Sequence, residues 1–209
     1  MATKTSTAIK LKPLNIREVK FAIVGTSSYI QHAWSQKALR SLRMTAAERR
    51  KQPKVGRTPE AEAEGAMYRL NGKPAFPLLQ LKASMINAAH KDLGIEKTLV
   101  KKSFFIPANN PERLIEMECS EPVIREDIVR VGMSQTDIRY RPEFHNWRVN
   151  VTAHYDADNL TDGDLINLVN RAGFGVGVGE WRPEKGGEFG RFKVDVTVPV
   201  TTKSLSEEY

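Results

Sequence analysis

Apolar and polar residues alternate with a period of two in three segments, a pattern typical of half-buried β-strands. These segments are 17–25, 147–155 and 192–198. The clearest is 147–155, where Trp147, Val149, Val151, Ala153 and Tyr155 alternate with Arg148, Asn150, Thr152 and His154. We expect each segment to bury one face against a core and to leave the other face polar.

Two further segments show the spacing of amphipathic helices. In the first, Pro77 opens a helix that Gly94 closes as the residue after its last turn. The buried stripe of that helix is predicted to be Leu78, Leu81, Met85, Ala88 and Ala89. The second helix starts after Thr161, with Asp164 completing an imperfect capping box, and ends at Gly173.

The order of these elements predicts the fold. Residues 104–118 and 122–141 contribute short strands and a hairpin, so two helices alternate with four core strands. This order indicates an α+β protein with a ferredoxin-like, RRM-like βαββαβ core whose second sheet face is open. We expect a single domain over 1–209, with an insertion at about 35–72, a hairpin at about 123–140 and a glycine-rich loop at 173–190.

Composition narrows the function classes. The 209 residues carry a formal net charge of +7, which favours polyanionic partners. Cys119 is the only cysteine, so an intrachain disulfide or a cysteine zinc site is excluded. The polar start lacks a signal-peptide core and no segment has the length of a membrane span, so we expect a cytoplasmic protein with no membrane partner.

The positive charge is concentrated in the insertion. Between Ser35 and Arg57 the only acidic residue is Glu48, and Pro53 and Gly56 interrupt the pattern. The basic side chains there are Lys37, Arg40, Arg43, Arg49, Arg50, Lys51, Lys54 and Arg57. A solvated helix face would explain such a run, but the imbalance favours an excursion that closes over a bound strand.

The stretch from Gly173 to Val196 combines seven glycines with aromatic and basic residues. A dinucleotide fingerprint needs a strand before its glycines and a helix after them, and here the order is reversed, so we expect no cofactor. Apolar residues between the glycines argue against a flexible linker. Two interpretations remain: a hairpin whose glycines satisfy tight turns, or a surface where backbone N–H groups approach a polyphosphate chain.

Three motifs together resemble the RAMP superfamily. GGEFGRFKV is similar to the superfamily's C-terminal glycine-rich loop, FPLLQLKASMINAA to its proline, Leu-Lys and small-residue helix, and FAIVGTSSYIQH to its opening strand and serine-containing turn. The likeness is strongest to the backbone subunit of CRISPR effector complexes, which polymerises along guide RNA. It implies a sheet as palm, insertions as fingers and a hairpin thumb that splays bases.

The resemblance also carries alternatives. The stretch with Glu60, Glu62 and Glu64 and the modest length of the chain depart from typical members. A phage-borne protein that coats single-stranded DNA therefore stays open. The superfamily includes metal-independent RNA-processing endoribonucleases with an early histidine as general acid or base, and His32 occupies such a place. Related subunits cleave RNA with a thumb aspartate, which points to Asp127 or Asp137, although acids beside arginines are more often ion-pair partners. No metal-binding motif is present, and no catalytic residue is assigned in the main interpretation.

We therefore expect a sequence-independent single-stranded nucleic-acid-binding subunit, RNA ahead of DNA, that assembles head to tail with copies of itself. Other effector-complex subunits are the further expected partners. A scaffold that binds only protein is the third class. Trp34, Trp181 and Phe189 are candidates for base stacking, with at least one of them expected in the core. The expected contact residues are Arg40, Arg43, Arg49, Arg50, Lys82, Gly177, Gly179, Trp181, Arg182, Lys185, Gly186, Gly187 and Arg191.

Overall fold

The main sheet is antiparallel throughout and is built around β1 (Ile16–Gly25). In the computed structural model, which describes residues 11–34, 36–51, 56–132 and 135–205, β1 pairs along most of its length with β9 (Arg148–Asp156). The sheet order is β10-β1-β9-β5, and β11 also pairs with β1. The other strands are β5 (Phe104–Phe105), β10 (Phe192–Val194) and β11 (Thr201–Ser204).

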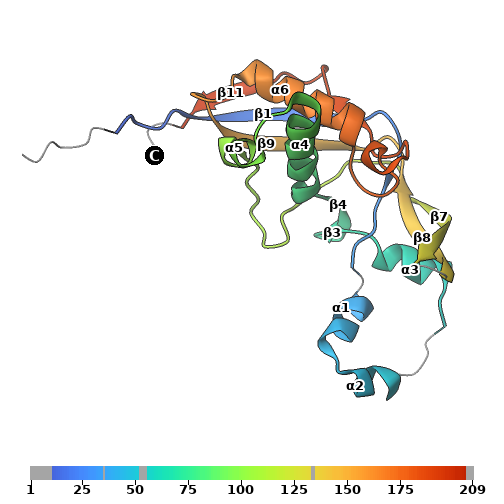
Figure 1. Ribbon diagram of the computed structural model, residues 1–209. Coiled ribbons are helices and arrows are strands. Elements are labelled where there is room, and N and C mark those ends of the chain that lie inside the picture. The colour runs from blue at the N-terminus through green and yellow to red at the C-terminus, as the bar shows by residue number, and fades with distance from the viewer. Residues whose placement is uncertain (1–10, 35, 52–55, 133–134, 206–209) are drawn as a thin grey trace, which may run out of the picture.

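Two helices cover one face of this sheet and form the core with it. They are α4 (Leu78–Leu93) and α6 (Asp162–Arg171), and Figure 1 shows both beside β1 and β9. The predicted stripe of α4 is buried, as are Trp147 and the alternate residues of β9 that follow it. The periodicity of these segments therefore predicts the buried face correctly. Folding removes the apolar surface of these side chains from water, which is favourable.

The caps of both helices also follow the sequence. Gly94 ends α4 in the left-handed conformation with φ of 68°, where a side chain would be strained. Thr161 accepts a hydrogen bond from the backbone N–H of Asp164, and the Asp164 carboxylate accepts one from Thr161 in return, which completes the capping box. These local hydrogen bonds lower the pKa of Asp164, because they stabilise its charged form.

The α+β class is confirmed. Read across the sheet, the core strands are β10, β1, β9 and β5, which are the fourth, first, third and second of them in chain order. Helix α4 follows the first of these strands in the chain, and α6 follows the third. This order supports the ferredoxin-like interpretation, and we keep it as an interpretation. The sheet face away from the helices carries the polar residues of β9.

Two predicted boundaries are wrong. The strand expected over 192–198 ends at Val194, because Asp195 turns the chain by accepting hydrogen bonds from Thr197. The helix expected to end at Gly173 continues as a π-helical turn, η1 (Ala172–Val176). Gly173 permits this turn, since a Cβ there would lie 1.9 Å from the carbonyl oxygen of Phe192.

A long hairpin leaves the sheet at one end. It consists of β7 (Val123–Val131) and β8 (Gln135–Phe144), and the base of β8 pairs with β2 (Tyr29–Ile30). A second small sheet and a helix complete the body beneath α4. Their bounds are β3 (Arg69–Leu70), β4 (Lys73–Pro77), β6 (Leu114–Glu116) and α5 (Lys97–Ser103).

The insertion contains three short helices, which differ in whether they pack against the rest of the protein. Its helix α3 (Pro59–Gly65) packs against the hairpin, with Ala63 buried. The helices α1 (Gln36–Arg43) and α2 (Ala46–Lys51) stand clear of the rest of the molecule in Figure 1. We call residues 36–51 the arm. The predicted breaker Pro53 and the predicted cation Lys54 lie outside the described residues.

Candidate nucleic-acid interface

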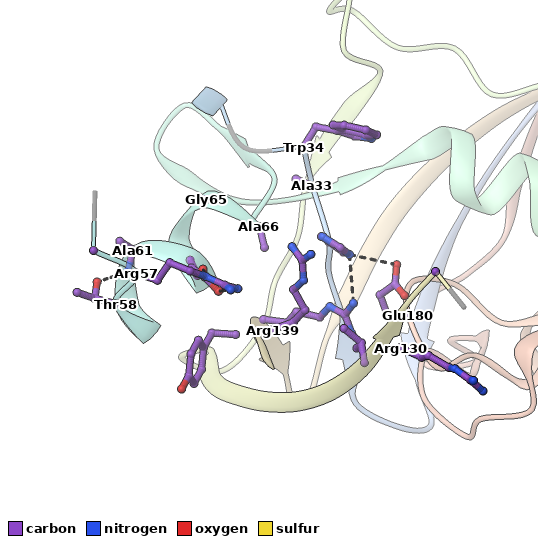
Figure 2. Close-up of a pocket in the computed structure, with 17 residues that line it drawn as sticks. Ala33, Trp34, Arg57, Thr58, Ala61, Gly65, Ala66, Arg130, Arg139 and Glu180 are labelled. Atoms are coloured by element: carbon purple, nitrogen blue, oxygen red, sulfur yellow. Dashed lines mark hydrogen bonds and ion pairs between the residues drawn. The ribbon is translucent and has the colours of Figure 1, made fainter. Parts of the chain in front are cut away.

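A cavity of about 970 Å³ opens between α3, the hairpin and the start of the glycine-rich loop. Figure 2 shows its lining, with Trp34 and Glu180 on different sides. Basic and aromatic side chains dominate its polar wall: His32, Trp34, Arg57, Arg130, Arg139, Tyr140 and Arg141. A hollow of this volume is large enough for a nucleotide-sized group.

Arg141, which lines this cavity, belongs to a buried ion-pair group of the hairpin. Asp127 accepts hydrogen bonds from Arg125 at 2.7 Å and from Arg141 at 3.2 Å, and both Asp127 and Arg141 are buried. Arg125 also reaches Glu143 at 3.2 Å and stacks over the ring of Phe189, 4.6 Å from its centroid. The interpretation of Asp127 as an ion-pair partner is therefore the one its contacts support, and the glycine-rich loop rests on the hairpin through Phe189.

His32 lies at the rim of the same group. Its Nδ1 is 3.3 Å from Nη2 of Arg141 and 3.7 Å from the carboxylate of Glu180. The hydrogen bond with His32 lowers the pKa of Glu180, burial raises it, and the nearby charge of Arg141 lowers it further. The net direction is downward, so Glu180 is a carboxylate at neutral pH and offsets part of the positive charge.

Arg57 fastens the return of the insertion to the hairpin. It forms an ion pair with Glu62 of α3, and it donates to the Asp137 carboxylate at 2.8 Å and to the Ile138 carbonyl at 2.7 Å. These contacts lower the pKa of Asp137, with the hydrogen bond from Arg57 as the main cause. The wall of the cavity formed by α3 is thereby held in place by one guanidinium.

The glycine-rich loop uses its backbone N–H groups internally. Gly177 donates to the carbonyl of Ala172 at 2.8 Å, and Gly179 donates to the side-chain oxygen of Gln80 at 3.1 Å. The N–H groups of Gly186 and Gly187 bond to the carbonyls of Pro183 and Arg182. These N–H groups therefore already have acceptors within the protein, which favours the first of the two interpretations of the glycines. Contact of the loop with nucleic acid stays a prediction.

Close packing explains most of these glycines instead. A Cβ on Gly179 would lie 2.4 Å from the Ile30 carbonyl oxygen, and a Cβ on Gly187 would lie 1.9 Å from that of Trp181. Gly190 is equally crowded, whereas a Cβ on Gly186 would meet nothing within 4 Å. These contacts favour the interpretation that the glycines are there because tight turns and close packing require them.

The predicted cations around the loop lie in different surroundings. Arg182 donates to Glu184 at 2.9 Å and to the Gly179 carbonyl at 3.0 Å, while Lys185 is exposed. Arg191 is half-buried, and its backbone N–H donates to the hydroxyl of Ser27. A second hollow of about 150 Å³ lies between this loop and α4, lined by His32, Gly177, Gly179 and Arg182 together with Glu184.

Lys82 lines neither cavity. Its ammonium nitrogen lies 4.3 Å from the ring centroid of Phe105 and 5.6 Å from that of Phe104. Burial lowers the pKa of Lys82, and the charge of Arg113 lowers it further. The structure therefore does not bring Lys82 together with the loop cations, and its predicted role is a separate contact.

Two tryptophans are presented to solvent near these features. Trp34 is 64% exposed and Trp181 is 40% exposed, and Phe189 is half-buried under Arg125. The expectation that one of the three belongs to the core is wrong, because Trp147 fills that place. Trp181 has φ of 50°, a left-handed backbone that bulky residues rarely adopt. Such strain persists only where the surroundings hold it, and it is common at binding sites.

The exposed basic residues of the arm form no ion pairs within the described part of the chain. Arg40, Arg43, Arg49, Arg50 and Lys51 are exposed, and none of them contacts a carboxylate within the part of the chain that the structure describes. Glu48, the only acid of the arm, accepts hydrogen bonds from the backbone N–H and hydroxyl of Thr45, which lower its pKa. The arm is therefore an unneutralised cationic surface, unlike the sheet face, where Glu18 and Asp195 lie against His154 and Arg148.

The described residues contain no group of three or more His, Cys, Asp or Glu side chains that could hold a metal ion. In the same part of the chain no helix is long and apolar enough to cross a membrane.

No family model matches the chain. The curated proteins likewise contain no match. Among solved structures, a similar chain occurs in the "Cryo-EM structure of the Type III-B Cmr-beta bound to cognate target RNA", with a TM-score of 0.45 and 7% identity. The match covers 91% of this chain and 61% of that chain, so this chain spans less than two thirds of its length. A likeness this low carries no conclusion about function.

Several residues of the site were missed in the sequence. Glu180, Arg139 and Arg141 line the cavity, yet none was a candidate. The alternation of the hairpin was an available signal, because Arg125, Asp127, Arg139 and Arg141 fall on one face of β7 and β8. The contact of Arg141 with His32 joins residues 109 positions apart and gives no local signal.

Proposed function

We propose that this chain is a sequence-independent single-stranded nucleic-acid-binding subunit, RNA ahead of DNA, that assembles head to tail along the strand as in a CRISPR effector backbone. The motif resemblance supplies the RNA preference, the assembly and the effector complex. The distribution of charge and aromatic residues in the structure supports the binding of a strand.

The observation that carries the proposal is the contrast between paired and unpaired cations. Elsewhere in the described chain, arginines such as Arg57, Arg125 and Arg141 are neutralised by carboxylates. The four predicted arginines of the arm are exposed and have no such partner. A cluster of uncompensated guanidinium groups raises the free energy of the isolated protein through mutual repulsion, and a phosphate backbone relieves it.

Aromatic side chains supply the second part of a single-strand surface. Trp34 lines the cavity between α3 and the hairpin, and Trp181 is exposed on the glycine-rich loop. Base stacking on such rings contributes about 1–3 kcal/mol per base and depends little on sequence. A strand whose phosphates follow the arm and whose bases reach Trp34 would use both features.

A fluorescence anisotropy titration with random-sequence single strands at two salt concentrations tests this proposal. For single strands the slope of log affinity against log salt is about −0.7 per neutralised phosphate. Replacing Arg40, Arg43, Arg49 and Arg50 with Gln should therefore reduce the slope by up to about 3. Undetectable binding, or binding that salt does not weaken, contradicts the proposal. Equal binding of RNA and DNA would remove the RNA preference, and oligomers that form with protein alone would favour a scaffold.

A second candidate function is supported by one contact. His32 sits at the cavity rim between Arg141 and Glu180, where a histidine can exchange a proton with a bound strand and a guanidinium can stabilise a phosphorane. This arrangement fits a metal-independent endoribonuclease that leaves a cyclic phosphate. Incubation with stem-loop RNA and analysis of the product ends would show cleavage that is lost in His32→Ala. Intact RNA with the unaltered protein would exclude this function.

A further inference from the structure

The two helices of the arm are too short to be stable without packing against the rest of the protein. Its helices α1 and α2 contain 8 and 6 residues, and α2 buries no side chain. Helices below about 12–15 residues are marginal in water, because the first turn costs more free energy than it returns. In proteins, packing against the rest of the fold normally offsets that cost.

That packing is missing here. None of the described residues of the arm belongs to the hydrophobic core, and Leu42 of α1 is 62% exposed. Figure 1 shows the arm clear of the sheet, the hairpin and α3. Among the residues that the structure describes, the chain that flanks the arm is held to the body by the hydrogen bond from Ala33 to the Ala66 carbonyl and by the contacts of Arg57.

Charge opposes the helical state further. The arm has six basic residues and one acidic residue, and the acidic one is used by the cap of α2. Arg40 and Arg43 lie three apart on one side of α1, where like charges repel. A free arm therefore loses helical stability from its charge pattern as well as from its length.

We propose that the arm is largely unfolded in the free protein and folds into α1 and α2 when it binds the phosphate backbone of a single strand. The inference rests on the proposed function and specifies how the arm takes part in it. A polyanion removes the repulsion, and the helices then display Arg40, Arg43, Arg49 and Arg50 in fixed positions. Part of the binding free energy is used to order the arm, as in other segments that fold on binding.

A phosphate backbone fits the arm better than a lipid surface does. An interfacial helix needs an apolar face, and α2, with the sequence AAERRK, has no large apolar residue. In α1 the large apolar residues are Leu39, which is half-buried, and Leu42, which is exposed. The shared feature of both helices is cationic charge, and a strand satisfies it along its whole length.

Hydrogen exchange of the full-length protein, with and without an oligouridylate of about 16 nucleotides, tests the inference. The amides of residues 36–51 should exchange without protection in the free protein and become protected on binding, while the amides of α4 stay protected in both states. Protection of the arm in the free protein, or no protection in the complex, overturns the inference.

Two charge-neutral variants provide a matched test of coupled folding. Ala47 is exposed in α2, and Ala47→Gly lowers helix propensity without removing a contact, so affinity should fall about fivefold. Ser41→Ala in α1 raises propensity, so affinity should rise about twofold. If both variants bind as the unaltered protein does, the arm does not fold on binding, although the proposed function stands.

Two further outcomes of these experiments distinguish failure of the inference from failure of the proposed function. Absence of strand binding in the unaltered protein overturns both. Protection of the arm by vesicles rich in anionic phospholipid, without protection by the oligouridylate, overturns the inference and identifies a lipid surface as the partner of the arm.

Discussion

Gly190 gives the sharpest test of how the glycine-rich loop is built. It has φ of 65°, and a Cβ there would lie 1.8 Å from the Val178 carbonyl oxygen. The same glycine accepts a hydrogen bond from the Val178 N–H at 2.9 Å and donates one to the Ser28 carbonyl at 2.7 Å. Gly190→Ala must therefore separate two segments that are bonded to each other.

The expected cost has three parts. A left-handed backbone costs about 1–2 kcal/mol for a residue with a Cβ, overpacking about 1–3 kcal/mol, and a lost hydrogen bond about 1 kcal/mol. We expect Gly190→Ala to lower the free energy of unfolding by roughly 3–6 kcal/mol, which lowers Tm by roughly 10 °C for a chain of this size.

Gly186→Ala is the matched control. Gly186 has φ of 80° in the same loop, but a Cβ there would meet nothing within 4 Å. Only the backbone strain of about 1–2 kcal/mol applies, and the expected fall in Tm is a few degrees. Urea unfolding followed by circular dichroism measures both variants, with an unchanged m-value showing that the native and unfolded states are comparable. Equal losses of stability in the two variants would refute the packing explanation.

Three further results are expected. Asp127→Asn leaves the buried Arg141 without its carboxylate and should cost about 3–5 kcal/mol in urea unfolding, and a loss below 1 kcal/mol would show that the pair is not buried in solution. The lowered pKa of Glu180, caused chiefly by His32, means that its stabilisation is present above its unfolded pKa of about 4.3 and is lost as pH falls through the lower folded value. Glu180→Gln should therefore reduce Tm at pH 6 and converge with the unaltered protein at strongly acid pH, and a constant difference would exclude this linkage. Trp181→Gly should raise stability by relieving the left-handed strain yet weaken strand binding about tenfold or more, and unchanged binding would remove Trp181 from the interface.

The elements that the sequence predicts well are those whose determinants are local. The stripe and Gly94 cap of α4, the capping box at Thr161 and the alternation of β9 all depend on residues within a few positions of each other. The end of α6 depends instead on contact between Gly173 and Phe192. No pattern within the helix reveals that contact.

The difference between local and long-range determinants also explains which parts of the candidate site could be predicted from the sequence. The unneutralised charge of the arm was visible in the sequence because its few acids and many bases are neighbours in the chain. The role of the glycines was not, since whether a peptide N–H is free depends on acceptors such as Gln80 and Ser28, far away in sequence. Glycine content alone indicates where a backbone approaches something closely, and the partner is decided by tertiary structure.

The hydrogen bond from Ala33 to the Ala66 carbonyl has a consequence for the evolution and engineering of this chain. This bond, 2.8 Å long, joins the two ends of residues 33–66. The arm therefore belongs to a single loop that leaves and re-enters the body at neighbouring points. Loop closure entropy rises only about 0.6 kcal/mol for each doubling of length. Lengthening, shortening or exchanging the arm, with Arg57 and α3 retained, should leave the body folded, which makes the arm a suitable place to graft a different strand-binding or reporter sequence.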